Sequence, residues 1–208
     1  MAAIYRYQRY IYDASRKYYL LGRDGLLDAL KPPAGGTVLE VACGTGRNLI
    51  KAARRYPGAQ FFGFDISNAM LETAAASVAR KNLSDRIKVA YGDATDFSAE
   101  RLFGVPAFDR VFVSYALSMI PPWRESLREA FRAVAPGGEL HVVDFSEQAG
   151  LPRWFRSGLR VWLAKFSVEP RAELEAELRQ IAAQSGAELR FEHLYGDYAC
   201  RAVLTKPL

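Results

Sequence analysis

The sequence lacks the features that would assign it to a secreted, metal-stabilised or membrane-spanning class of protein. It has only two cysteines, Cys43 and Cys200, and they lie far apart. Two such cysteines make neither a disulfide framework nor a structural zinc site, so we expect no metal centre and a cytoplasmic location. No segment approaches the roughly 18 apolar residues of a membrane-spanning helix, and the charged N-terminus has no apolar signal-peptide core. These absences predict a protein that is soluble or peripherally bound to a membrane.

Internal repeats, low-complexity tracts and glycine- or serine-rich linkers are also absent, which predicts a single domain over residues 1–208. Half of the residues are hydrophobic and a quarter are charged, which is the composition of a globular protein. The net charge of +5 favours an anionic partner, either nucleic acid or an anionic membrane. A basic protein without any such partner is the equal alternative.

Short apolar segments alternate with segments of helical periodicity along most of the chain. The segments typical of strands are residues 37–42, 60–66, 86–94, 108–117 and 139–145. Those typical of helices are residues 48–56, 67–82, 123–134 and 172–186, the third of which ends at Pro136-Gly137-Gly138. This alternation predicts a parallel sheet with helices on both faces. Residues 189–197 and 198–206 predict a hairpin, so we expect a Rossmann-like, doubly wound α/β fold whose seven-stranded, mostly parallel sheet has an antiparallel C-terminal end.

The N-terminal segment is rich in tyrosine. Six of the eleven tyrosines, together with five lysines or arginines, lie between Ile4 and Asp24. Helical spacing of its apolar residues leads us to expect an N-terminal helical lid over residues 1–34, next to a cofactor-binding core at 37–145. A basic amphipathic insertion at 146–170 and a C-terminal helix and hairpin at 171–208 complete the predicted organisation.

A glycine turn after the first predicted strand indicates a ligand site. Gly44 and Gly46 let a ligand approach the backbone, in front of the N–H groups that begin the next helix. Glu40 ends the first strand and suits a cationic or zwitterionic ligand, whereas Asp65 ends the second and can hold a ribose diol. A dinucleotide site of the G-x-G-x-x-G type needs a third glycine at position 49, where this chain has Leu49.

The motifs VLEVACGTG, FDIS, GDAT and APGGELHVVDF, in this order, resemble those of class I S-adenosylmethionine-dependent methyltransferases. The resemblance implies that S-adenosyl-L-methionine is the cofactor and that the protein is an enzyme that transfers its methyl group. In that family a glycine usually stands where this chain has Ala42. Glu40 would lie near the methionine amino group, Asp65 would hold the ribose, and Asp93 the adenine edge. The full set that the resemblance assigns to the cofactor is Glu40, Ala42, Gly44, Gly46, Asp65, Ile66, Met70, Asp93, Ala94 and Ser114.

Aromatic rings suit methyl transfer to an amine, because they hold a cation without offering it a competing acceptor. Tyr18 and Tyr19 of the lid and Tyr115 after the fourth strand are therefore the predicted catalytic residues. The plain alternative is that these tyrosines pack the lid onto the domain. No general base is evident, since His141 and His193 both fall within predicted strands.

Residues 151–166 form a second unusual segment. As a helix it would have one largely apolar face, made by Leu151, Phe155, Leu159, Trp162 and Phe166 and joined by Trp154 and Leu163. A basic amphipathic helix with tryptophans suits the surface of an anionic membrane, which makes Trp154 and Trp162 candidate membrane contacts. The alternative is a cover of the substrate site that packs against the N-terminal helix.

The stretch YDASRKYYLLGRD, residues 12–24, resembles the opening of bacterial diacylglyceryl-homoserine N-methyltransferases of betaine-lipid synthesis. This resemblance implies a lipid acceptor with an amino headgroup at the inner face of the membrane, whose carboxylate Arg16 or Arg23 would bind. Phosphatidylethanolamine N-methylation and a small-molecule methyltransferase of the quinone type are the alternatives. RNA methylation is disfavoured, because SYALSMIPPW lacks the N/D-P-P-Y/F motif of base-methylating enzymes. The intact cofactor set argues against a non-catalytic scaffold.

Overall fold

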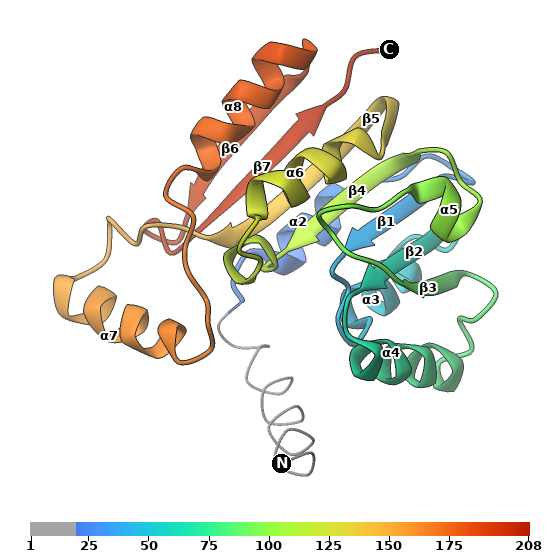
Figure 1. Ribbon diagram of the computed structural model, residues 1–208, viewed down its shortest axis with the longest axis horizontal. Helices are drawn as coiled ribbons and strands as arrows, with labels where there is room; N and C mark the ends of the chain where they lie inside the picture. The colour runs from blue at the N-terminus through green and yellow to red at the C-terminus, as the bar shows by residue number, and fades with distance from the viewer. Residues whose placement is uncertain (1–19) are drawn as a thin grey trace.

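The computed structural model describes residues 20–208, and a seven-stranded sheet runs through this part of the chain (Figure 1). The strand order is β3-β2-β1-β4-β5-β7-β6. Strands β1 to β5 run parallel, whereas β7 is antiparallel to both β5 and β6. The predicted fold class, a doubly wound sheet with an antiparallel C-terminal hairpin, is therefore confirmed.

The elements follow the predicted alternation closely. The strands are β1 (Thr37–Val41), β2 (Gln60–Asp65), β3 (Ile87–Tyr91), β4 (Phe108–Ser114), β5 (Val134–Phe145), β6 (Glu188–Leu194) and β7 (Ala199–Thr205). The helices are α2 (Arg23–Ala29), α3 (Arg47–Arg55), α4 (Asn68–Arg80), α5 (Ala99–Phe103), α6 (Trp123–Arg132), α7 (Arg153–Ala164) and α8 (Leu174–Ser185), with a 3₁₀ turn η1 (Leu117–Met119). The sequence analysis does not anticipate α5 and η1, which are short enough to show no helical period.

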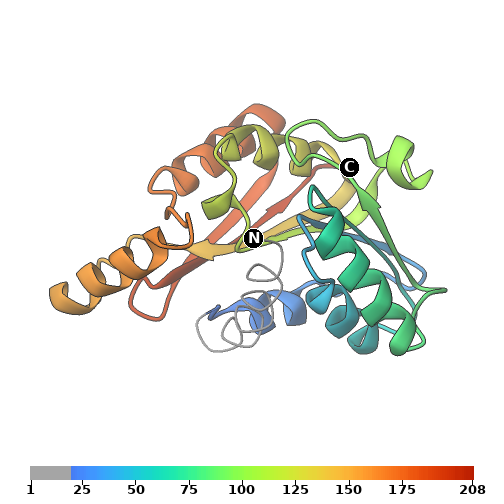
Figure 2. The same ribbon diagram turned by 60° about the horizontal axis from the view of Figure 1, so that its bottom comes forward.

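Helices cover both faces of the sheet, and each face has its own hydrophobic core (Figure 2). Leu39 and Val41 of β1 belong to the core that α5, α6 and α8 cover, whereas Val38 belongs to the core under α2, α3 and α4. Successive side chains of a strand point to opposite faces. A strand covered on both sides is therefore largely apolar, and in TVLEV the valines and the leucine are interrupted only by Glu40.

Strand β5 begins earlier than the sequence predicts. It starts at Val134 and includes Pro136-Gly137-Gly138, which the sequence pattern marks as the break after a helix. The pairing of β4 with β5 shifts register between Phe108 and Arg110. A Cβ atom on Gly138 would lie 2.8 Å from the carbonyl oxygen of Asp109, so glycine is what lets the two strands approach here. The Pro136-Gly137-Gly138 segment is thus an irregular first part of β5 and not a break before it.

The predicted insertion contains a helix, but a shorter one than residues 151–166. Helix α7 runs from Arg153 to Ala164, so Leu151 and Phe166 lie beyond its two ends. Pro152 precedes the first helical residue, a position that tolerates proline because the N–H there has no helical partner. In the described part of the chain, no helix is both long and apolar enough to cross a membrane.

Candidate functional site

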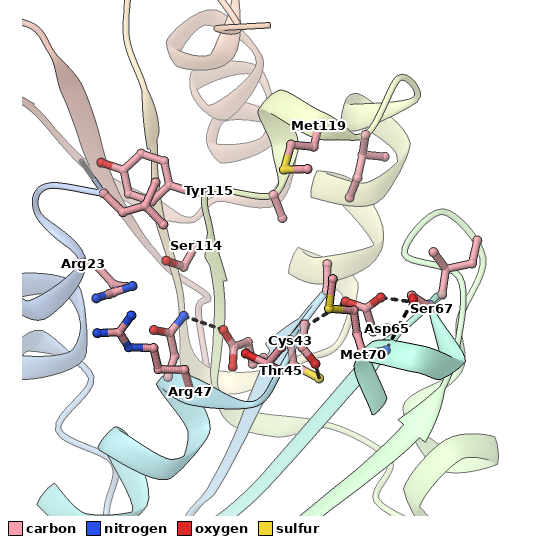
Figure 3. Close-up of a pocket in the computed structure, with 18 residues that line it drawn as sticks. Arg23, Cys43, Thr45, Arg47, Asp65, Ser67, Met70, Ser114, Tyr115 and Met119 are labelled. Carbon is pink, nitrogen blue, oxygen red and sulfur yellow. Dashed lines mark hydrogen bonds between the residues drawn. The ribbon is translucent and has the colours of Figure 1, made fainter. Parts of the chain in front are cut away.

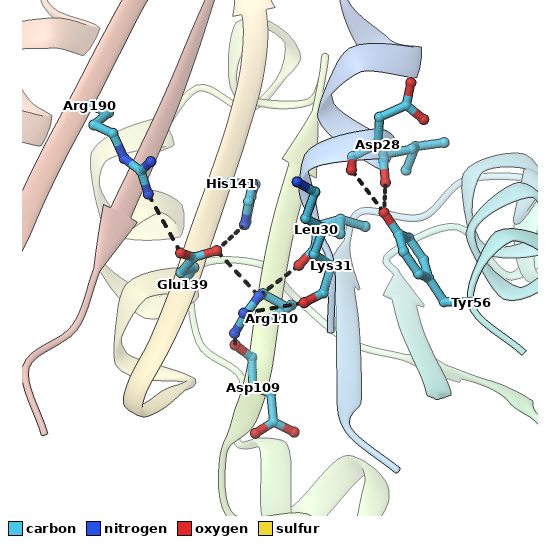
Figure 4. Close-up of polar contacts among 10 residues, drawn as sticks. Asp28, Leu30, Lys31, Tyr56, Asp109, Arg110, Glu139, His141 and Arg190 are labelled. Carbon is cyan, nitrogen blue, oxygen red and sulfur yellow. Dashed lines mark hydrogen bonds and ion pairs between the residues drawn. The ribbon is translucent and has the colours of Figure 1, made fainter. Parts of the chain in front are cut away.

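A cavity of about 310 Å³ lies at the carboxyl ends of β1 and β4 (Figure 3), where doubly wound sheets commonly bind ligands. A second hollow of about 280 Å³ extends it across the ends of β2 and β3. The two share five lining residues: Ala42, Asp65, Ile66, Met119 and Ile120. They form one elongated groove, which we call the strand-end cleft.

Glu40 lies in the wall of this cleft and is only 2% exposed. Its Oε1 accepts a 2.7 Å hydrogen bond from Asn48 Nδ2, whereas Oε2 is buried and has no partner among the described residues. Burial raises the pKa of Glu40 to about 8, and the nearby Asp65 carboxylate acts in the same direction. A ligand ammonium group would give Oε2 a partner and favour the charged carboxylate.

Two further atoms in the same cavity are buried without a partner among the described residues, Arg23 Nε and Ser114 Oγ. Burial is the largest cause that lowers the pKa of Arg23, and the positive charge of the neighbouring Arg47 lowers it further. The negative charge of the nearby Glu40 acts in the opposite direction and raises this pKa. Figure 3 shows the two guanidinium groups side by side at one end of the cavity. Two cations beside one buried acid are the arrangement that suits the carboxylate and ammonium groups of a free amino acid.

The side chain of Asp65 connects the glycine turn after β1 to the start of α4 by hydrogen bonds. Its Oδ2 accepts a 2.8 Å hydrogen bond from the backbone N–H of Gly44, and its Oδ1 accepts one of 2.9 Å from that of Ser67. Each carboxylate oxygen keeps a second lone pair, so a diol can still bind. Ser67 caps α4 through its side chain, as its sequence position predicts.

The backbone at the end of β1 explains why the methyltransferase motif prefers glycine at position 42. Ala42 has a φ of 55°, in the left-handed region where a side chain is strained. Gly46 has a φ of 71° at the N-cap of α3 and donates its N–H to the carbonyl of Cys43. Gly46 lines neither hollow. Its contribution is the turn that places Gly44 against the cleft.

The second hollow contains the predicted adenine-binding residues. Asp93 and Ala94 both line it, next to Thr95. Asp93 Oδ1 accepts 2.8 Å hydrogen bonds from the N–H and the hydroxyl of Thr95, which lower the pKa of this carboxyl. The loop that carries Asp93 is thereby held in one conformation beside the apolar wall of Ile66 and Ile120.

Tyr115 follows β4 and lines the first cavity, but it is also a core residue. It is 2% exposed, its ring contacts Phe145 edge-on at 4.7 Å between centroids, and its hydroxyl donates to the carbonyl of Leu21. With the hydroxyl so engaged, Tyr115 can act on a substrate only through its ring. The hydrogen bond attaches the chain leading to α2 to the end of β4.

The remaining predicted residues divide into three groups. Ile66, Met70 and Ser114 line the first cavity as expected, whereas Trp154 and Trp162 lie on α7 and line neither hollow. Tyr18, Tyr19 and Arg16 lie outside the described residues, so their predicted roles stay predictions.

The sequence analysis misses several residues of the cleft, among them Arg47, Asn48, Met119 and Ile120. Arg47 and Asn48 occupy the first turn of α3, directly after the glycine turn, and this position is the signal that could have found them. Met119 and Ile120 form the wall common to both hollows. No sequence pattern places the turn η1 over the cleft, because only the tertiary fold brings it there.

The seven-stranded sheet and the strand-end cleft together define a class I S-adenosylmethionine-dependent methyltransferase domain. The partnerless atoms of Glu40 and Arg23 fit the amino-acid end of that cofactor, and Asp65 and Asp93 follow in the order of its ribose and adenine. By sequence, residues 38–138 match the family described as "Methyltransferase domain".

Named relatives agree with this family. The chain is 31% identical over 127 residues to a ubiquinone/menaquinone biosynthesis C-methyltransferase of Cereibacter sphaeroides, covering 61% of this chain and 49% of that protein. It is 30% identical to nocamycin O-methyltransferase of Saccharothrix syringae over 85% of this chain and 62% of that one. The chain thus spans about half the length of the first of these relatives.

A solved structure with a similar fold has the cofactor bound. Phosphoethanolamine N-methyltransferase 2 of Haemonchus contortus, in complex with S-adenosyl-L-methionine, superimposes with a TM-score of 0.70 at 18% identity. The superposition covers 89% of this chain and 52% of that one. At this identity the likeness concerns the fold, which is the same class I architecture.

Proposed function

We propose that this chain is an enzyme that transfers the methyl group of S-adenosylmethionine to an acceptor with a large apolar body. The observation that carries the proposal is that the wall of the first cavity contains the apolar side chains of Leu20, Met119 and Ile120 besides the polar group around Glu40. A wall that combines charged and apolar side chains suits a zwitterionic cofactor and an apolar acceptor.

The chain's residues would act mainly by positioning. When bound, the cofactor supplies an electrophilic methyl group on sulfur. We expect Glu40, Arg23 and Arg47 to hold its amino-acid end and Asp65 its ribose, so that the methyl group points toward the apolar side of the cavity. In this arrangement Arg23 contacts the cofactor rather than a carboxylate of the acceptor, because it lies close to Glu40.

The first candidate acceptor is a quinol ring. It is supported by the relative from Cereibacter sphaeroides, whose name describes a C-methyltransferase of ubiquinone and menaquinone biosynthesis. This support favours the quinone-type alternative over betaine-lipid synthesis. A prenylated quinol would place its tail along the apolar side chains of Leu20, Met119 and Ile120.

The second candidate is the amine of a lipid headgroup, either diacylglyceryl-homoserine or phosphatidylethanolamine. The observation in its favour is that the cavity wall, within the described residues, has no histidine and no acid besides Glu40 and Asp65. Both of those acids already accept hydrogen bonds from the chain. A quinol ring reacts fastest after it loses a phenolic proton, which requires a base in the cavity. An amine can lose its proton to water and therefore needs no dedicated base.

A methyl-transfer assay with each acceptor in turn distinguishes the candidates. The protein is incubated with methyl-labelled S-adenosylmethionine and, separately, a demethylmenaquinol, diacylglyceryl-homoserine or phosphatidylethanolamine in mixed micelles. Label in the quinol supports the first candidate, and label in either amino lipid supports the second. Transfer to none of them, with transfer to short water-soluble phenols instead, would contradict an apolar acceptor.

A further inference from the structure

Helix α7 extends away from the sheet as an arm at one end of the molecule (Figure 1). Only one of its 12 residues, Leu163, is buried. Trp154 is 78% exposed and Val161 64%, and Phe155 and Phe166 are more than a third exposed. A water-soluble surface seldom exposes this many large apolar side chains in one short segment, so their exposure calls for an apolar partner.

The positive charge of residues 150–168 indicates which kind of apolar partner they bind. Residues 150–168 contain Arg153, Arg156, Arg160 and Lys165 and no acidic residue. Arg160 is within 3.3 Å of Glu147, which leaves a clear excess of positive charge around the exposed rings. Tryptophan and phenylalanine interleaved with cations match the headgroup boundary of an anionic bilayer, whereas a protein groove would be matched by the apolar residues alone.

The inner side of α7 fixes the arm to the domain. Leu159 and Trp162 pack, half-buried, against the core cluster that includes Leu163 and Val168. Beyond the helix, the N–H of Glu169 donates to the carbonyl of Ser118, and the guanidinium of Arg171 donates to the carbonyls of Leu117 and Ile120. The exposed face is therefore held at a set orientation to the cleft.

The arm and the cleft lie at the same edge of the sheet. Helix α7 follows the carboxyl end of β5, and the first cavity lies at the carboxyl ends of β1 and β4, which run parallel to β5. Exposed Met119 and Tyr195 lie at this edge too, the latter in the turn of the C-terminal hairpin. A flat surface that touches α7 at this edge would be close to the mouth of the cleft.

We infer that α7 docks the protein onto an anionic lipid bilayer, with Trp154, Phe155 and Val161 in the headgroup region and Arg153, Arg156 and Lys165 at lipid phosphates. This deepens the proposed function, since it gives an acceptor dissolved in the membrane a direct way into the cleft. The docking itself requires neither cofactor nor acceptor.

Vesicle sedimentation tests the inference independently of activity. The full chain should sediment with vesicles of phosphatidylcholine and phosphatidylglycerol, and less with pure phosphatidylcholine or at high salt. R153A/R156A should lower the partition coefficient about fivefold per charge removed. R80A/K81A removes two exposed cations from α4 and should leave binding unchanged. An equal loss in both variants would mean diffuse attraction by net charge and would overturn the role of α7.

Depth measurements test the contact residue by residue. Lipids brominated near the headgroup should quench the fluorescence of the wild-type protein, and W154F should lose most of that quenching while it still sediments. Trp123 is 4% exposed in the core, so W123F, checked for its melting temperature, should retain the quenching. Quenching that survives in W154F would overturn the inference. Methyl transfer to a water-soluble acceptor, unaffected by vesicles, would contradict the proposed acceptor class but not the docking.

Discussion

The amide of Asn48 donates a 2.7 Å hydrogen bond to Oε1 of Glu40, across the turn that joins β1 to α3. This bond is the main interaction that favours the charged form of a carboxyl whose burial opposes it. It also orients the carboxylate so that Oε2, which has no described partner, remains for a ligand. We therefore expect Asn48 to position Glu40 for the cofactor.

Replacing Asn48 by alanine should weaken S-adenosylmethionine binding about tenfold, since a buried hydrogen bond to a charged group contributes roughly 1.5–3 kcal/mol. Isothermal titration calorimetry measures the change directly. N68A is the matched control, because Asn68 begins α4, is exposed and lines neither hollow. Equal affinities of N48A and the wild type would show that Glu40 does not hold the cofactor.

The raised pKa of Glu40 predicts how stability varies with pH. Between the ordinary pKa of 4.5 and about 8, the folded protein keeps the Glu40 proton and the unfolded chain has lost it. The free energy of unfolding of the cofactor-free protein should therefore fall as pH rises through this window, by an amount on the order of a few kcal/mol. Melting temperatures of wild type and E40Q between pH 5 and 9 test this.

E40Q has no proton to lose, so its melting temperature should exceed that of the wild type at pH 8, with the two curves converging near pH 5. Its affinity for S-adenosylmethionine should be lower at every pH, because the amide cannot pair with an ammonium group. Parallel melting curves over the whole range would contradict the raised pKa.

Ala42→Gly should stabilise the protein. The φ of 55° costs an alanine roughly 1 kcal/mol that glycine does not pay, and the larger freedom of glycine in the unfolded chain offsets part of the gain. We expect a net gain of about 0.5 kcal/mol in chemical denaturation. Ala59 is buried directly before β2 and does not have a positive φ, so Ala59→Gly should destabilise the protein instead.

Substitutions of Tyr115 should distinguish the contribution of its hydroxyl from that of its ring. Y115F removes the hydrogen bond to Leu21 but keeps the contact with Phe145, so it should lower stability by about 1 kcal/mol and change kcat little. Y115A removes the ring from a packed core and should cost about 3–5 kcal/mol. A large loss of kcat in a folded Y115F would assign the hydroxyl a direct catalytic role.

The sequence predicts the sheet and its hairpin because the strands are largely apolar and are separated by clear turns. Glu40, Asp65 and Asp93 lie at or just beyond the carboxyl ends of the first three strands. The sequence does not predict that η1 closes the cleft, since Met119 and Ile120 come there through the packing of α6 and β5. Nor does the sequence predict whether a given arginine contacts the cofactor or the acceptor. Arg23 lies 17 residues before Glu40 in the chain, and only the fold of α2 against the sheet brings them together.

The guanidinium of Arg171 spans the two carbonyls that flank the 3₁₀ turn, those of Leu117 and Ile120. Asp144 holds the same turn from the sheet side, through the N–H of Ser118. The turn is thus braced from two directions, and Met119 at its end cannot swing outward unless one brace breaks. We expect this rigid turn to slow the exchange of spent for fresh cofactor past Met119.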